Sequence, residues 1–168
     1  GILDGIAITG GEPLLQKDIL SFMKRLKDEG VSVKLDTNGA YPDKLREAID
    51  KGLVDYVAMD IKNSKEKYAL TTGIQNIDIA PFEESVKILL ENKVDYEFRT
   101  TVVNGFHETQ DIEKIAQWIH GAKAYHLQAF KDNFLLGDIH NGEVSESDMN
   151  KMAEIARKYL SNVTIRGI

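Results

Sequence analysis

Acidic side chains follow three apolar segments of this sequence, at positions where they could share one binding site. The segment "GIAITGGEP" passes through Gly10 and Gly11 and then presents Glu12. "VSVKLDTNG" ends its apolar run at Asp36, and "VDYVAMDIK" ends at Asp60. Carboxylates gathered in this way bind metal ions or cationic ligands, and glycines let a ligand approach the backbone closely.

The glycines and the proline around Glu12 predict a sharp exit from an extended segment. Gly10 and Gly11 permit positive φ angles, and Pro13 disfavours helical geometry at Glu12. Glu12 would then be held over the end of the strand, facing a ligand. The same motif is also compatible with a glycine turn before a helix, in which Glu12 only complements the helix dipole.

Three carboxylates at one edge need positive charge nearby. Like charges 4 Å apart repel by roughly 1–4 kcal/mol per pair, depending on the local dielectric. Lys62 is one candidate cation, and Arg99 is another, since in "YEFRTTVV" it shares a polar face with Glu97 and Thr101. A bound metal ion or a cationic ligand could supply the rest. The alternative is that the three acids are solvated and cap helices.

The spacing of apolar residues predicts strands that alternate with helices. Apolar runs of strand length occupy 4–9, 31–36, 53–60, 94–103, 123–129 and 162–166. Helical spacing appears between them, in the stripes Ile19–Phe22–Met23–Leu26, Leu45–Ala48–Ile49, Phe82–Val86–Leu89–Leu90, Ile112–Ile115–Ala116–Ile119 and Met152–Ile155–Ala156–Tyr159. This order is typical of βαβ units around a parallel sheet, which is an α/β fold.

Boundary residues support these helices, and two stretches break the pattern. Pro42 fits a first helical turn, and Ser145 with Asp148 forms a capping box before the last helix. The stretches 62–80 and 130–144 both follow strands, so we expect them at the carboxyl edge of the sheet, where parallel α/β folds bind ligands.

Composition narrows the class of protein. The 168 residues carry a net charge of −6 and no cysteine, and no apolar run is long enough to cross a bilayer. We expect one cytoplasmic domain over 1–168 with no nucleic-acid partner and no membrane contact. Without cysteine, the chain offers no disulfide, no thiolate metal ligand and no thiol nucleophile.

Five segments together resemble a radical S-adenosylmethionine (SAM) protein: "ITGGEP", "KLDTNG", "VDYVAMDIK", "VDYEFRTTVV" and "VTIRGI". The sequence is most similar to the activating proteins of anaerobic ribonucleoside-triphosphate reductase, which are close relatives of pyruvate formate-lyase activating enzyme. The similarity extends over nearly the whole chain. It implies a partial (βα) TIM-type barrel of about six parallel strands, with the first βα unit missing.

The resemblance also implies which residues bind SAM. Gly10, Gly11 and Glu12 match the "GGE" segment that holds the methionine ammonium of SAM. The family's "D-x-K" segment, which contacts SAM, corresponds to Asp60, Ile61 and Lys62. In addition, Arg99 matches an arginine near the SAM carboxylate.

A cation site is implied by the same resemblance. Asp36, Thr37 and Asp60, with a backbone carbonyl near Ala58, match a site for a monovalent cation in the activating enzymes. An ion there would relieve the repulsion between Asp36 and Asp60.

The absence of cysteine departs from the family pattern. The family binds a [4Fe–4S] cluster through the three thiolates of C-x-x-x-C-x-x-C, after the first strand. The segment "GILDGIAITGGEP" resembles the second strand of such a protein, so we expect the first strand and its cysteine loop to be absent. This chain would then have no catalytic residue and would be inactive alone, and its uncovered strand 4–9 would favour self-association.

The parent protein would carry the activity. It would take an electron from a donor protein through the cluster and cleave SAM to methionine and a 5′-deoxyadenosyl radical. That radical would abstract a hydrogen atom from a glycine of the partner, a glycyl-radical enzyme, here anaerobic ribonucleotide reductase.

Two alternatives stay open. A cluster-free relative could serve as a SAM-binding or protein-interaction module. A metal-dependent hydrolase could use Asp36 and Asp60, but such sites usually add histidines, and the only histidine on a predicted strand is His126. We interpret His120 and His126 as structural and expect His107 and His140 in loops; Lys131 stands where pyruvate formate-lyase activating enzymes have a histidine.

Overall fold

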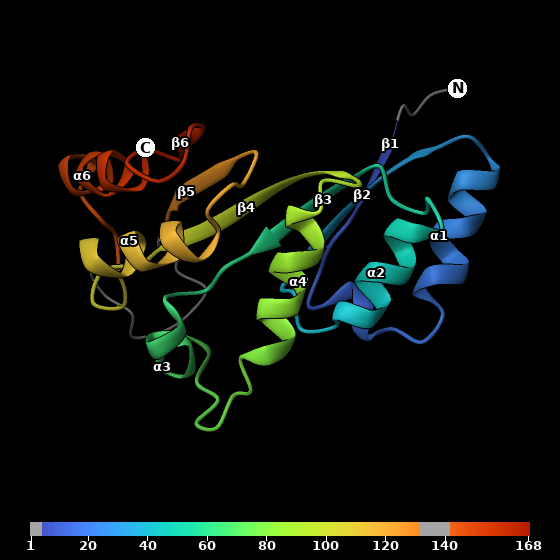
Figure 1. Ribbon diagram of the computed structural model, residues 1–168, viewed down its shortest axis with the longest axis horizontal. Coiled ribbons are helices and arrows are strands. Elements are labelled where there is room, and N and C mark those ends of the chain that lie inside the picture. The colour runs from blue at the N-terminus through green and yellow to red at the C-terminus, as the bar shows by residue number, and fades with distance from the viewer. Residues whose placement is uncertain (1–4, 132–141) are drawn as a thin grey trace. The chain divides into compact units, whose positions relative to one another are not determined.

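A computed structural model describes residues 5–131 and 142–168, in which strands and helices alternate along the chain (Figure 1). Six strands form one sheet in the order β1-β2-β3-β4-β5-β6, and β1 and β6 are its edges, so the sheet is not closed. The pairs β1–β2, β2–β3, β4–β5 and β5–β6 are parallel. This confirms the predicted α/β fold. The chain divides into two compact units, which are described in turn.

The first unit comprises residues 1–60 and 78–97. Its elements are β1 (Gly5–Ile8), the 3₁₀ helix η1 (Pro13–Leu15), α1 (Ile19–Asp28), β2 (Ser32–Thr37), α2 (Pro42–Asp50), β3 (Tyr56–Asp60) and α4 (Ala80–Leu90), and β4 (Asp95–Val102) begins here. Side chains alternate along β2, with Leu35 fully buried between the half-exposed Lys34 and Asp36. One face of β2 therefore belongs to the apolar core, and the other presents charged groups.

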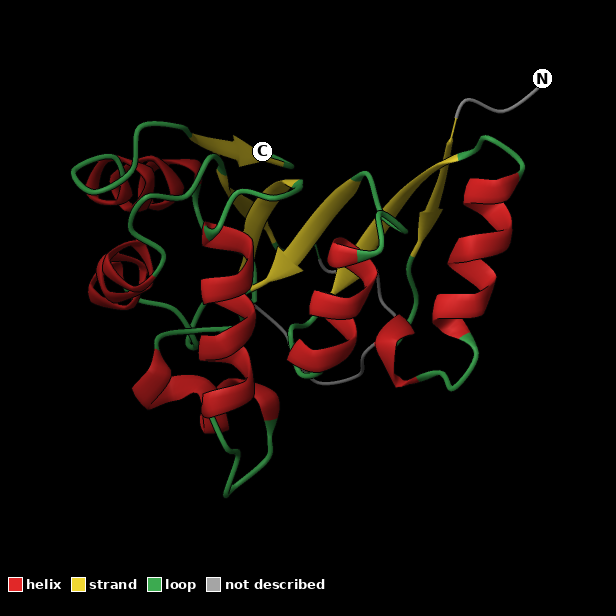
Figure 2. Cartoon of the chain, turned by 45° about the vertical axis from the view of Figure 1, so that its right-hand side comes forward, coloured by secondary structure: helices red, strands yellow, loops and turns green. Residues whose placement is uncertain are grey.

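The second unit comprises residues 61–77 and 98–168. It contains the 3₁₀ helix η2 (Lys65–Lys67), α3 (Tyr68–Thr72), most of β4, α5 (Thr109–Trp118), β5 (Tyr125–Ala129), α6 (Glu146–Ala156) and β6 (Val163–Arg166). Figure 2 shows how loops join these helices and strands. Ser145 caps α6, because its hydroxyl accepts a hydrogen bond from the Asp148 backbone N–H at 3.1 Å, which is the Ser145 half of the predicted capping box.

Two details differ from the predicted elements. The stretch 62–80 is not irregular throughout but contains η2 and α3. Tyr159 lies beyond the end of α6, although it continues the apolar stripe of that helix. Residues 132–141 of the predicted 130–144 loop, with His140, lie outside the described residues.

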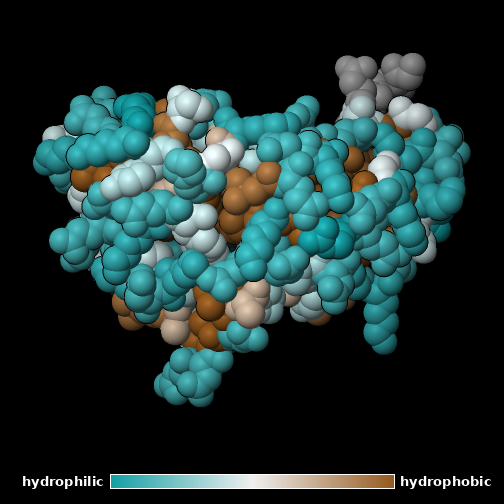
Figure 3. Space-filling model, viewed as in Figure 1, coloured by the Kyte–Doolittle hydropathy of each residue, from teal (hydrophilic) through white to brown (hydrophobic). Residues whose placement is uncertain are grey.

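One face of the molecule is largely polar. The face shown in Figure 3 is mostly hydrophilic, and its hydrophobic residues form small separate patches. Across residues 5–131 and 142–168, every helix is too short or too polar to pass through a membrane.

Candidate functional site

The exit from β1 has the backbone geometry expected of the "GGEP" motif. Gly10 has a φ of +131°, which side chains rarely allow, and Glu12 is extended with φ −132° and ψ 107°. Pro13 then opens η1, whose N-cap is Glu12: its Oε1 accepts a hydrogen bond from the Leu14 backbone N–H at 3.1 Å. Glu12 therefore does cap a short helix, which was one of the two interpretations of the motif.

The same carboxylate also reaches the residues that end β2. The hydroxyl of Thr37 donates to Glu12 Oε1 at 2.9 Å, and the Asn38 backbone N–H donates to Oε2 at 2.7 Å. A carboxylate can accept about four hydrogen bonds. Among the described residues, Oε2 accepts one, from Asn38, so this oxygen can take a further donor.

The turn after β2 is held in place by Gly39. Its φ is +82°, and a Cβ at this position would collide with Cε of Met59. The Gly39 N–H donates to Thr37 Oγ1 at 3.1 Å, and its carbonyl accepts from Ser85 Oγ at 2.7 Å. The positive φ favours glycine here, a larger residue would also have to displace the end of Met59, and the turn orients the groups that bind Glu12.

The backbone at Gly10 and Gly11 is open. Apart from the glycine itself and its two chain neighbours, an ideal Cβ on either glycine meets no atom of the described residues within 4 Å. This is the room that a ligand would need in order to approach the backbone beside Glu12. The glycines and the carboxylate therefore fit a bound amino-acid group carrying an ammonium ion.

Asp36 and Asp60 lie on neighbouring strands of the first unit. Asp36 pairs in register with Ala58, so Asp60, two residues later, is on the same face of the sheet near its carboxyl end. Lys34, two residues before Asp36, places its Nζ 3.1 Å from Asp36 Oδ1. This counter-charge was missed from the sequence, although K-x-D in a strand puts both side chains on one face.

No metal centre of the usual kind is present within 5–131 and 142–168, since no group of three or more His, Cys, Asp or Glu side chains could hold an ion there. The predicted cation site uses only two carboxylates, Asp36 and Asp60. Its third member, Thr37, already donates its hydroxyl proton to Glu12 and accepts from Gly39. Thr37 directly follows Asp36 in β2, so its side chain lies on the opposite face of the sheet from that of Asp36.

Ile61, Lys62 and Arg99 belong to the second unit. The Ile61 backbone N–H donates to the Arg99 carbonyl at 2.8 Å, and the Ile61 carbonyl accepts from Thr100 Oγ1 at 2.8 Å. These bonds connect the backbone of Ile61, next to Lys62, with the backbone of β4 at Arg99. The other candidates, Gly10, Gly11, Glu12, Asp36, Thr37 and Asp60, belong to the first unit.

His107 lies in a loop, as expected, but unlike most loop residues it is buried. It is 5% exposed, and its Nε2 lies 2.8 Å from the Lys62 carbonyl oxygen. Burial lowers the pKa of His107, although hydrogen bonds with the backbone of Lys62 and Val103 act against this. His126, by contrast, pairs with Thr164 across β5 and β6, as expected of a structural residue.

Comparison with known proteins gives one family. The model of the Radical SAM superfamily matches residues 1–119. Two proteins of Methanocaldococcus jannaschii, classed as glycyl-radical enzyme activating enzymes, are 34% and 32% identical over 98% and 96% of this chain. The chain spans 71% of the first relative and 63% of the second.

Solved structures share the fold. A domain of pyruvate-formate lyase-activating enzyme from Bacteroides vulgatus matches with a TM-score of 0.78 at 18% identity, over 97% of this chain and 99% of that one. SuiB of Streptococcus suis bound to S-adenosylmethionine matches with a TM-score of 0.70 at 12% identity, over 97% of this chain and 39% of that one. At such identities the likeness establishes the fold alone.

Proposed function

Because the chain belongs to the radical SAM superfamily, we propose that it is the SAM-binding part of a protein that activates a glycyl-radical enzyme. The observation that carries this proposal is the Glu12 carboxylate, held at the end of β2 beside the open backbone of Gly10 and Gly11. A negative group fixed beside an accessible backbone suits the ammonium of a bound amino acid.

Glu12 and the two glycines form the ammonium subsite in this proposal. Hydrogen bonds from Leu14, Thr37 and Asn38 hold the carboxylate, so little side-chain freedom remains to be lost when the ligand binds. Gly10 and Gly11 leave the adjacent backbone accessible.

The remaining contacts to SAM are assigned to Asp60, Ile61, Lys62 and Arg99, by their match to the family's segments. The hydrogen bond between the Ile61 N–H and the Arg99 carbonyl supports a shared role for the last three. Asp36, Thr37 and Asp60 would hold a monovalent cation, and Lys34 already supplies part of the positive charge.

Reductive cleavage of SAM needs an electron from a [4Fe–4S] cluster, and this chain contains no cysteine to hold one. We therefore assign to this chain the binding and orientation of SAM, and not the electron transfer. In the whole protein the partner would be anaerobic ribonucleotide reductase. Electron paramagnetic resonance would test this partner, since the whole protein with SAM and a reductant should raise a glycyl-radical signal on that reductase and not on pyruvate formate-lyase.

Titration calorimetry with two ligands tests the ammonium subsite. The variant Glu12→Gln loses a charged hydrogen bond, so SAM should bind about 10- to 100-fold more weakly. Binding of 5′-methylthioadenosine, which lacks the amino-acid group, should be unchanged. Glu29→Gln, at an exposed residue after α1, is the matched control and should bind SAM like the parent chain.

Comparing SAM with 5′-methylthioadenosine distinguishes the loss of the ammonium contact from general damage to the binding site. If Glu12→Gln weakened both ligands equally, the carboxylate would be structural only. If neither ligand bound to the unaltered chain, the assignment of SAM binding to this chain would be wrong.

A further inference from the structure

The segment that follows β3 is attached to the beginning of α5 by buried polar contacts. His107 Nε2 lies 2.8 Å from the Lys62 carbonyl oxygen, and the Val103 backbone N–H donates to His107 Nδ1 at 3.1 Å. Nδ1 is closer to the Val103 backbone nitrogen than to the Val103 carbonyl oxygen, which lies 3.4 Å away, so for the neutral ring we assign Nδ1 as the unprotonated nitrogen. The proton is then on Nε2, which donates to the Lys62 carbonyl.

The neighbouring backbone is fixed on both sides of Lys62. Ile61 is fully buried and is hydrogen bonded to Arg99 and Thr100 in β4. Asn63 is fully buried as well, and its side-chain amide donates to Thr71 Oγ1 at 2.8 Å and to the Phe106 carbonyl at 2.9 Å. Hydrogen bonds therefore hold the segment on both sides of Lys62.

Charged groups extend this attachment along α5. Lys67 Nζ lies 2.7 Å from Asp111 Oδ2, and Asp111 is 3% exposed. Burial alone would raise the pKa of Asp111, but hydrogen bonds from Lys67 and the Glu108 N–H outweigh it and lower that pKa. Asp111 also accepts from Ser64 Oγ at 3.3 Å, so one buried carboxylate holds two residues of the segment.

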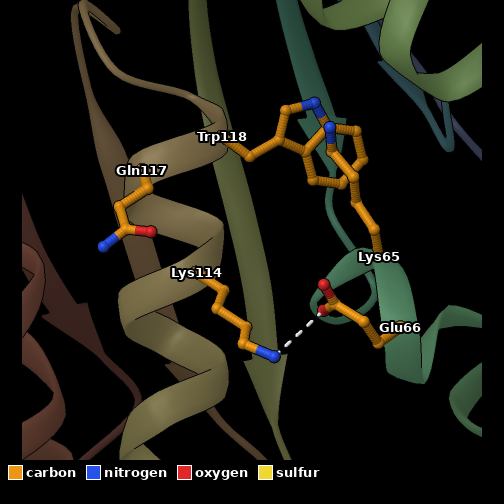
Figure 4. A pocket seen from close by; sticks show the side chains of 5 residues that line it. All are labelled: Lys65, Glu66, Lys114, Gln117 and Trp118. Carbon is orange, nitrogen blue, oxygen red and sulfur yellow. Dashed lines mark ion pairs between the residues drawn. The ribbon is translucent and has the colours of Figure 1, made fainter.

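A hollow of about 310 Å³ lies between η2 and α5, beside these contacts (Figure 4). Lys114 on α5 pairs with Glu66 at 3.3 Å, and Lys65 Nζ stands over the Trp118 ring, 5.1 Å from its centre. The cations that line the hollow are therefore engaged in holding η2 against α5.

We propose that His107 is a positioning residue for Lys62: by binding the Lys62 carbonyl, it sets the backbone from which the Lys62 side chain reaches its ligand. The proposal rests on the SAM-binding role assigned to Lys62 above. His107 acts through the backbone and does not touch the ligand. A change at His107 should therefore act on ligand affinity only as far as it releases Lys62.

Two amide variants separate the two hydrogen bonds of the ring. In His107→Gln the amide nitrogen can occupy the place of Nε2 and keep the bond to the Lys62 carbonyl. In His107→Asn the shorter side chain can accept from Val103 but cannot reach Lys62. We expect SAM to bind to the Gln variant within about threefold of the parent and to the Asn variant about tenfold more weakly.

Amide hydrogen exchange provides a readout that does not require SAM. Exchange in residues 61–64 should accelerate in His107→Asn and stay close to the parent in His107→Gln, while exchange in α6 stays unchanged in both. His120→Asn, at an exposed histidine of the same unit, is the control and should change neither affinity nor exchange.

The outcomes are distinct. Equal exchange in residues 61–64 of the Asn and Gln variants would overturn the positioning role, and so would equal SAM affinities. If exchange separated the two variants but SAM bound to none of the proteins, His107 would still hold Lys62, and the SAM-binding function itself would be refuted.

Discussion

Replacing Gly39 by alanine should destabilise the turn that holds Glu12. The φ of +82° at Gly39 disfavours any side chain, and the added Cβ would meet Met59 Cε. Gly30 has a similar φ of +75°, but a Cβ there meets no atom within 4 Å. The two glycines therefore separate the cost of conformation from the cost of crowding.

The expected losses of unfolding free energy differ between the Gly30 and Gly39 variants. Gly30→Ala should lower the free energy of unfolding by about 1 kcal/mol, since a non-glycine residue with positive φ is strained. Gly39→Ala should carry that cost and a further roughly 1–3 kcal/mol for overpacking. Met59 can yield in part, because the atom that it presents is the end of a flexible side chain.

Urea denaturation of both variants measures the difference, and Met59→Leu tests its cause. Leucine has no Cε, so in the Met59→Leu background the excess cost of Gly39→Ala should shrink toward that of Gly30→Ala. SAM affinity should fall in Gly39→Ala only, because Thr37 and Asn38 would shift away from Glu12. If Gly39→Ala cost no more than Gly30→Ala, or if Met59→Leu left the excess unchanged, the steric reasoning would be wrong.

Three further results are expected. Burial lowers the pKa of His107 below its ordinary 6.5, so folding favours the neutral ring. The resulting contribution of His107 to the free energy of unfolding is present above about pH 6.5 and declines as the pH falls toward the lowered pKa, by at most about 1.4 kcal/mol per pH unit. The variant His107→Gln should lack this component of the pH dependence. Tyr125→Phe removes the hydroxyl that donates to Thr100 Oγ1 at 2.9 Å and should lower the free energy of unfolding by about 1 kcal/mol in chemical denaturation. Light scattering well above micromolar concentration should show self-association through the outer edge of β1, and Ile6→Pro should reduce it; a monodisperse parent monomer would contradict this.

The strands were predictable because each is a short apolar run bounded by turn residues. β2 was expected at 31–36 and is found at Ser32–Thr37, and β5 was expected at 123–129 and is found at Tyr125–Ala129. The strand expected at 53–60 begins later, at Tyr56, although Leu53 and Val54 are buried. These two residues are apolar because they are buried, and they do not belong to the strand.

The short helices η2 and α3 could not be predicted from periodicity. Their sequence is polar at first, and the stability of α3 depends on a tertiary contact: Tyr68 is fully buried and meets Trp118 edge to face at 6.1 Å. Contacts of this kind connect segments far apart in the chain. The bond between His107 and Lys62 spans 45 residues, so neither local sequence contains a sign of it.

The hydrogen bonds of Glu12 show that its observed role as a helix cap is compatible with the ligand-binding role proposed for it. Oε1 accepts from the Leu14 N–H and the Thr37 hydroxyl, while Oε2 accepts from the Asn38 N–H. The capping bond fixes the direction in which the carboxylate points, and the bonds from the end of β2 keep it at the edge of the sheet. A group held in this way has lost its conformational freedom during folding, so a cationic ligand need not order it on binding. If SAM binds to Glu12 as proposed, capping orients this carboxylate for the ligand, and the loss of folding stability and the loss of SAM affinity in Gly39→Ala should appear together.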